Sequence, residues 1–117
     1  MRRNVSYGLR RLNGALDWKG TTDENHLLWS QLVPALHSSS LPDGTYGGNP
    51  SGFVVETSDG NFYYSGDTAL TMDLRLIGES TLLAFAALCV GDNFTMGIDD
   101  AIKAAEFIRC NKVVGVH

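Results

Sequence analysis

The stretch that decides the fold is residues 82–116, LLAFAALCVGDNFTMGIDDAIKAAEFIRCNKVVGV. It opens with an uninterrupted apolar run, Leu82 to Val90, which is typical of a strand buried on both faces. After a glycine-containing loop, isoleucine and alanine recur at helical spacing over residues 98–109. Residues 112–116 are apolar after Lys112, which predicts another buried strand. A strand, a helix and a strand in this order predict an α/β domain with helices packed against a sheet.

Earlier segments add further elements to this α/β pattern. The sequence predicts strands over residues 32–36, 52–57 and 61–65, with a hairpin turn at Ser58-Asp59-Gly60, and a short helix over residues 71–77 that Gly78 ends. In the helix over residues 98–109, the predicted buried face consists of Ile98, Ala101, Ile102, Ala105 and Ile108. Asp99 and Asp100 fall in its first turn, where the helix dipole favours acidic side chains.

The chain divides into two zones of different character. Residues 1–31 show neither a helical nor a strand period, so we expect an irregular N-terminal segment there. Residues 32–117 contain all the predicted elements and form the predicted domain. With 117 residues in total, the chain has room for one small core.

Composition excludes several classes of function. The net charge of −4 argues against a nucleic-acid partner, because phosphate binding needs a basic surface. No apolar stretch follows the basic start in the manner of a secretory signal, and the run at residues 82–90 is too short to span a membrane. The two cysteines, Cys89 and Cys110, form no paired motif and suggest free core thiols in the reducing cytoplasm.

Three side chains that could bind a metal ion follow predicted strands directly: His37, Asp67 and His117. Strand ends open into loops at one edge of a sheet, where ligand sites of α/β proteins gather. Two imidazoles and a carboxylate suit zinc or a similar divalent ion. Spacing alone also allows the plainer interpretation that each histidine is a hydrogen-bonded structural residue.

Five motifs then resemble a known family. They are His37-Ser38-Ser39-Ser40, Tyr46-Gly47-Gly48-Asn49-Pro50-Ser51-Gly52-Phe53, Tyr64-Ser65-Gly66-Asp67-Thr68, Gly91-Asp92-Asn93-Phe94-Thr95-Met96-Gly97 with Asp99-Asp100-Ala101, and Gly115-Val116-His117. In this order they resemble the uncharacterised metal-dependent hydrolases of the metallo-β-lactamase superfamily. The resemblance begins near Leu32 and does not include residues 1–31.

This resemblance implies a fold, a metal site and a reaction. The fold would be the C-terminal half of a metallo-β-lactamase-type αββα sandwich. His37 would bind one metal ion, Asp67 would bridge two, and His117 would bind the second. With one or two zinc ions, such an enzyme would activate a water molecule to hydrolyse a small-molecule ester, amide, lactone or phosphodiester.

The chain departs from the family in one respect that bears on activity. The superfamily's His-x-His-x-Asp-His cluster, which supplies most metal ligands, does not occur in these residues, and His26 is the only other histidine. A truncated, frame-shifted or incompletely predicted gene would explain this departure. The alternative function is therefore a catalytically silent remnant or a small non-enzymatic module. We also expect an uncovered apolar face that promotes oligomerisation.

A serine hydrolase is a second alternative, built on the triplet Ser38-Ser39-Ser40 with His117 and Asp67. Its nucleophile would need a Gly-x-Ser-x-Gly turn, and the sequence contains none there. The serines are better interpreted as a polar loop.

Overall fold

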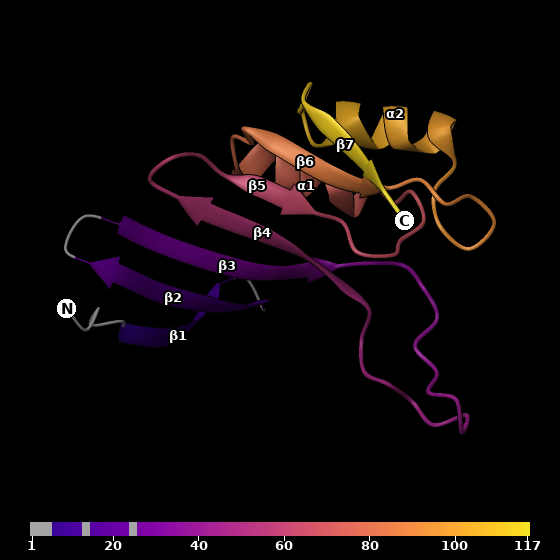
Figure 1. The fold of residues 1–117 in the computed structure, drawn as a ribbon, viewed down its shortest axis with the longest axis horizontal. Helices are drawn as coiled ribbons and strands as arrows, with labels where there is room; N and C mark the ends of the chain where they lie inside the picture. The colour runs from indigo at the N-terminus through magenta and orange to yellow at the C-terminus, as the bar shows by residue number, and fades with distance from the viewer. Residues whose placement is uncertain (1–5, 13–14, 24–25) are drawn as a thin grey trace.

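The computed structural model describes the backbone of residues 6–12, 15–23 and 26–117, and the side chains from Ser30 onward. The elements are β1 (Ser6–Leu12), β2 (Ala15–Asp23), β3 (His26–Pro34), β4 (Ser51–Thr57), β5 (Phe62–Tyr64), α1 (Asp73–Ser80), β6 (Phe85–Cys89), α2 (Ile98–Phe107) and β7 (Val113–Val116). Figure 1 shows them as one twisted sheet with both helices beside its C-terminal strands.

The strands form a seven-stranded sheet in the order of the sequence, β1 to β7. Strands β1 to β5 are antiparallel neighbours, whereas β5, β6 and β7 run parallel to one another. The change of direction has a topological cause. Parallel neighbours need a crossover, and α1 and α2 provide the two crossovers that return the chain to the same end of the sheet.

The prediction of an irregular segment over residues 1–31 is wrong for the part of it that the structure describes. Strands β1 and β2 lie inside this range, and β3 crosses the predicted boundary and ends at Pro34. Residues 1–5, 13–14 and 24–25 lie outside the description. Strand formation depends on pairing with a neighbour, and here β3 pairs with β4 along seven positions, which local periodicity cannot reveal.

The core lies between the helices and one face of the sheet. Val54, Tyr63 and Ala86 are paired across β4, β5 and β6, so their side chains share this face, and all three are buried. Leu74 of α1 and Ile108, which follows α2, belong to the same cluster. This packing fixes the three parallel strands, whose ends carry two of the predicted ligands.

Three details of the predicted elements are wrong. Gly78 does not end α1, which continues to Ser80. The glycine instead leaves room for the backbone at the end of α2, which lies close to it. Ile98 and Ile102 are exposed, whereas the buried face of α2 contains Ala101 and Ala104; small residues are buried where the helix lies close to the sheet. Strand β7 is mostly exposed, because it is the edge strand. Neither described helix has the length and apolar character needed to cross a membrane.

Candidate functional site

Asp67 and His117 come together at the carboxyl edge of the parallel strands. Asp67 lies in the loop after β5, and His117 directly follows β7. Because β5, β6 and β7 are parallel, their ends meet at one edge, and Figure 1 shows the C-terminus beside the loop after β5. The His117 Nδ1 atom lies 3.0 Å from the Asp67 Oδ1 atom. Both side chains are accessible to solvent, so a ligand can reach them.

His37 lies near this edge, but the structure gives its ring no contact with the other two side chains. The preceding residue is tied to the loop after Asp67: the Leu36 amide donates to Thr68 Oγ1 at 2.9 Å, and the Ala69 amide donates to the Leu36 carbonyl. The Nδ1 atom of His37 lies at hydrogen-bond distance, 2.8 Å, from the carbonyl oxygen of Ser38. Among the residues with described side chains, no three His, Cys, Asp or Glu residues form a group that could hold a metal ion.

The hydrogen bond of His37 determines which ring nitrogen can act as a ligand. A carbonyl oxygen only accepts, so Nδ1 carries the proton. In the neutral imidazole, Nε2 then keeps its lone pair. Histidines that bind metals commonly have one nitrogen fixed by a carbonyl or carboxylate while the other binds the ion. The donor chemistry of His37 therefore fits a metal ligand.

A buried network behind Asp67 holds its loop against β6. The Ser65 hydroxyl accepts a hydrogen bond of 2.9 Å from the Cys89 amide. The Cys89 thiol accepts the Thr68 amide at 3.4 Å and lies 3.3 Å from the Thr68 carbonyl, to which it donates. Ser65, Thr68 and Cys89 are all essentially inaccessible to solvent. The chain on both sides of Asp67 is thus anchored, which limits where its carboxylate can lie.

Sequence reasoning missed these positioning residues. Cys89 was expected to be a core filler, yet its sulfur bonds the backbone next to Asp67. The available signal was Thr68 in the Gly66-Asp67-Thr68 motif, since a polar residue beside a ligand often orients it. Gly66 belongs to the same group: its φ is +59°, and a Cβ there would lie 2.7 Å from the Ser51 carbonyl oxygen.

The loop between β3 and β4 is tied internally, which weakens the serine-hydrolase alternative. The Ser39 hydroxyl donates to the Gly48 carbonyl, so it is engaged in closing the loop. Asp43 accepts hydrogen bonds from the Thr45 hydroxyl and amide, and these hold the pKa of its carboxyl below the usual value. These contacts support the interpretation of the loop as a polar turn structure.

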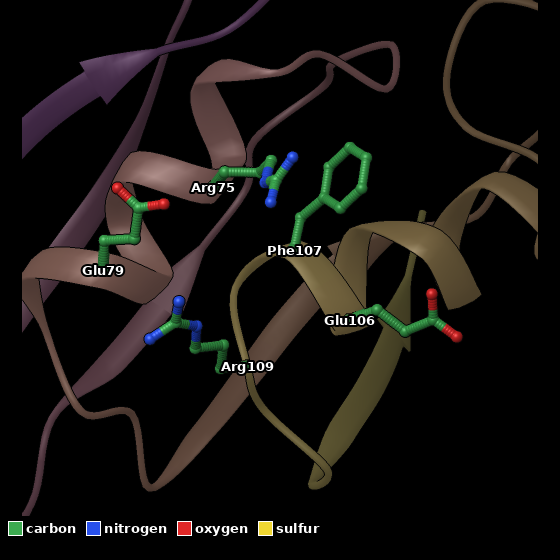
Figure 2. Close-up of a pocket in the computed structure, with 5 residues that line it drawn as sticks. All are labelled: Arg75, Glu79, Glu106, Phe107 and Arg109. Atoms are coloured by element: carbon green, nitrogen blue, oxygen red, sulfur yellow. The ribbon is translucent and has the colours of Figure 1, made fainter.

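A separate pocket lies between the two helices, and none of its lining residues belongs to the carboxyl edge of the parallel strands. It has a volume of about 220 Å³ and is lined by Arg75, Glu79, Glu106, Phe107 and Arg109. Figure 2 shows the Arg75 side chain extending from α1 toward the Phe107 ring, and the guanidinium lies 5.8 Å from the ring centroid. None of the predicted metal ligands lines this pocket, so it is distinct from the candidate site.

The fold and site define a mixed α/β protein with an aspartate and a histidine at the ends of parallel strands. The family described as the beta-lactamase superfamily domain matches residues 4–117, and the chain belongs to this family. The predicted family and α/β fold class are therefore confirmed. The prediction that residues 1–31 do not resemble the family is wrong, because the match begins at residue 4.

Two relatives described as UPF0173 metal-dependent hydrolases are similar to most of this chain and are longer than it. The one from Christiangramia forsetii is 59% identical over 87 residues, which are 74% of this chain and 38% of the relative. The one from Thermus thermophilus is 57% identical over 89 residues, which are 76% of this chain and 39% of the relative. The chain thus spans about two fifths of the length of the curated relatives it matches.

Solved structures support the same fold. Igni18, described as a novel metallo hydrolase from Ignicoccus hospitalis, aligns with a TM-score of 0.67 at 28% identity, covering 100% of this chain and 44% of that one. An isothiocyanate hydrolase from Delia radicum gut bacteria aligns with a TM-score of 0.57 at 18% identity, covering 92% of this chain and 44% of that one. The second likeness concerns the fold alone.

Proposed function

We propose that this chain contributes metal ligands to a hydrolase site, with His37, Asp67 and His117 as the ligands and zinc as the metal. The observation that carries the proposal is the contact of 3.0 Å between Asp67 and His117 at the strand ends. Family membership supports it, since the curated relatives are described as metal-dependent hydrolases. One or two bound zinc ions would supply a water molecule acidified enough to act as the nucleophile.

The chain's own residues would orient the ligands. The Asp67 carboxylate lies 3.0 Å from His117 Nδ1 through one oxygen, and both side chains are accessible, so together they would hold a metal ion at the strand ends. The Ser38 carbonyl holds the His37 ring through Nδ1, so that the Nε2 lone pair would be available to a metal ion. The buried Thr68 and Cys89 fix the loop that carries Asp67. No side chain attacks the substrate in this scheme.

The substrate we propose is a small molecule with an ester, amide, lactone or phosphodiester bond, hydrolysed in the cytoplasm. All four bonds are cleaved by a metal-activated water, so the site chemistry is the same for each. A negatively charged chain is a poor match for nucleic acid, which supports a small substrate.

A catalytically silent module is the second candidate, and the number of ligands favours it. Catalytic zinc usually has three protein ligands and a water molecule. Three ligands shared between two ions leave each ion with fewer than that. We therefore expect negligible hydrolysis by these 117 residues alone, even with excess zinc.

Zinc binding by the purified chain tests the ligand assignment. Titration calorimetry should show that Asp67→Asn weakens zinc binding at least about 10-fold, whereas Asp59→Asn, an exposed carboxylate in the hairpin turn, leaves it unchanged. Equal zinc affinity in both variants would remove Asp67 from the site.

Activity is tested by adding further candidate ligands. A fusion that places a segment with the His-x-His-x-Asp-His cluster before residue 4 should bind zinc tightly and hydrolyse model esters or phosphodiesters. Asp67→Ala in the fusion should abolish turnover. Robust turnover by the unfused chain would show that the ligand count is misjudged.

A further inference from the structure

The pocket between α1 and α2 is bordered by two guanidinium groups. Arg75 of α1 and Arg109, which follows α2, both line this pocket of about 220 Å³. Figure 2 shows the two side chains extending into the space between the helices. The Arg75 guanidinium lies 5.8 Å from the centroid of the Phe107 ring, and this cation–π contact holds it over the pocket. Two cationic groups from different parts of the chain therefore meet at one pocket.

The positive charges of this pocket are not neutralised by the carboxylates beside them. Glu79 and Glu106 also line the pocket, yet among the described side chains neither carboxylate is close enough to a guanidinium to form an ion pair. Figure 2 shows the Glu106 carboxylate pointing away from Arg109. Each guanidinium carries five N–H donors, which leaves both groups able to bind an anion.

Arg109 occupies a backbone position that favours glycine. It follows the C-cap residue of α2, and its φ is +54°. Its amide donates to the Glu106 carbonyl at 3.1 Å, and the Cys110 amide donates to the Ala105 carbonyl at 3.0 Å, which are the two hydrogen bonds of a Schellman motif. Glycine is the usual residue there, because an L-residue with this φ has a backbone cost. A cation at a helix C-terminus recovers only part of that cost, so the side chain of Arg109 needs a further reason.

Gly78 brings the two helices close enough for both arginines to reach one ligand. A Cβ at Gly78 would lie 2.4 Å from the Phe107 carbonyl oxygen and 2.8 Å from the Ile108 Cα atom. The missing side chain therefore lets α1 approach the end of α2. Arg75 lies about one helical turn before this contact, and Arg109 directly follows it. The contact that packs the helices thus also shapes the pocket.

The size and the donors of the pocket suit a phosphate group. Its volume of about 220 Å³ is below the roughly 300–1,000 Å³ of pockets that hold drug-sized ligands, so a small group fits. A guanidinium presents a planar fork of donors that matches the oxygens of carboxylates and phosphates. One fork can occupy both oxygens of a carboxylate, whereas two forks suit the three terminal oxygens of a phosphate monoester. The Phe107 ring adds an apolar wall beside the phosphate position.

We propose that Arg75 and Arg109 bind the phosphate group of a small phosphorylated molecule in the pocket between α1 and α2. Both guanidinium groups donate charge-assisted hydrogen bonds to the phosphate oxygens. Because both arginines are exposed, solvent screens these contacts, and the dissociation constant should be on the order of 1 mM. None of the candidate metal ligands lines the pocket, so binding requires no metal ion.

Inorganic phosphate and phenyl phosphate test the proposal in a chain freed of metal by dialysis against a chelator. In nuclear magnetic resonance titrations at constant ionic strength, the amide signals of Arg109 and Cys110 should shift saturably with both probes. Phenyl phosphate should bind at least as tightly as phosphate, since its ring can contact Phe107. Acetate should bind at least about 10-fold more weakly, because it fills one guanidinium fork. Shifts that do not saturate, a failure of phenyl phosphate to bind, or equal affinity for acetate would overturn the proposal.

Arg109→Gly separates binding from stability, because the two should change in opposite directions. The melting temperature should rise by about 2 °C or more, since glycine adopts this backbone conformation without strain. The dissociation constant for phosphate should rise at least about 10-fold, because one of the two forks is lost. A melting temperature at or below that of the parent would refute the argument from the backbone of Arg109. Unchanged phosphate affinity would remove Arg109 from the site.

Arg75→Lys tests the second guanidinium without changing the net charge. Lysine keeps the positive charge but not the planar fork, so phosphate binding should weaken at least about 5-fold. Lys103→Gln is the matched control, because Lys103 is exposed on α2 and does not line the pocket. The control should bind phosphate as tightly as the parent. An equal loss of affinity in both variants would mean that general charge attracts phosphate, and it would overturn the assignment of the pocket.

Discussion

Replacing Gly66 with alanine should affect both the stability of the chain and the candidate metal site. Gly66 has a φ of +59°, and a Cβ at this position would lie 2.7 Å from the Ser51 carbonyl oxygen. The left-handed backbone costs an L-residue about 1–2 kcal/mol. The close contact with backbone adds about 1–3 kcal/mol, as overpacking commonly does. The free energy of unfolding should therefore fall by about 2–5 kcal/mol, a large share of a small domain's stability.

The two contributions can be separated with a matched glycine. Gly44 has a φ of +85°, but nothing lies within 4 Å of a Cβ built there. Gly44→Ala should therefore lower the free energy of unfolding by the backbone contribution alone, about 1–2 kcal/mol. Urea denaturation of both variants measures the difference, and titration calorimetry measures zinc binding. Because Asp67 follows Gly66 directly, only Gly66→Ala should also weaken zinc binding, at least about 10-fold.

Two results would refute this reasoning. If Gly66→Ala and Gly44→Ala have the same unfolding free energy, the approach of Ser51 to Gly66 does not constrain the loop. If Gly66→Ala is less stable but binds zinc as tightly as the parent, the position of Asp67 does not depend on this turn. The second outcome would also count against Asp67 as a ligand.

Three further predictions follow from buried contacts. Gly78→Ala should lower the free energy of unfolding by at least about 1 kcal/mol, because the new Cβ would lie 2.4 Å from a backbone oxygen at the end of α2. This cost should exceed the gain from the better helix propensity of alanine. A variant that is more stable than the parent in chemical denaturation would contradict the prediction. Tyr63→Phe should leave stability unchanged or raise it by up to about 2 kcal/mol, since the buried Tyr63 hydroxyl has no hydrogen-bond partner among the described residues. Burial raises the pKa of the Tyr63 hydroxyl in the folded chain, so the folded state holds the Tyr63 proton more tightly than the unfolded state. The stability that comes from this difference is fully present below pH 10 and declines as the pH rises above that value. Thermal melts at increasing pH should therefore show a smaller loss of stability in the phenylalanine variant. Cys89→Ala should lower the free energy of unfolding by about 1–3 kcal/mol and weaken zinc binding, because the buried Thr68 amide loses its acceptor. The control Cys110→Ala should leave zinc binding unchanged. Equal zinc affinities in the two variants would show that the Cys89 thiol does not position the loop.

Local patterns predicted the elements whose sequence carries a complete signal. The strand predicted over residues 52–57 corresponds to β4, the one over residues 61–65 contains β5, and the helix over residues 98–109 contains α2. In each case the residue types, the period and the flanking turn residues agree. The placement of Asp67 and His117 at one edge also followed from sequence, because parallel strands joined by helices must end on the same side.

Features that depend on distant partners could not be predicted. Strands β1 to β3 owe their regular form to pairing along the sheet, and their sequence lacks alternation. Gly78 looks like a helix stop, but it serves the contact between the two helices. The exposed Ile98 and Ile102 reflect how α2 is rotated against the sheet, and its own period leaves that rotation open.

The candidate site combines rigid support with few candidate ligands among the described side chains, and the two properties have different origins. Rigidity comes from the buried side of the chain: Ser65, Thr68 and Cys89 tie the Asp67 loop to β6, and the helix-covered core holds β6 in place. The number of ligands depends on which residues reach the sheet edge, and among the residues with described side chains Asp67 and His117 are the two that come into contact, with His37 nearby. A preorganised carboxylate binds an ion more tightly as each further ligand is added, because the ordering of its loop is already complete. Added ligands should therefore raise zinc affinity without changing the stability of the loop in the metal-free state. Hydrogen exchange of the Thr68 amide should be the same in the metal-free chain and the metal-free fusion. A marked difference would mean that the added segment, and not the network around Cys89, holds Asp67 in position.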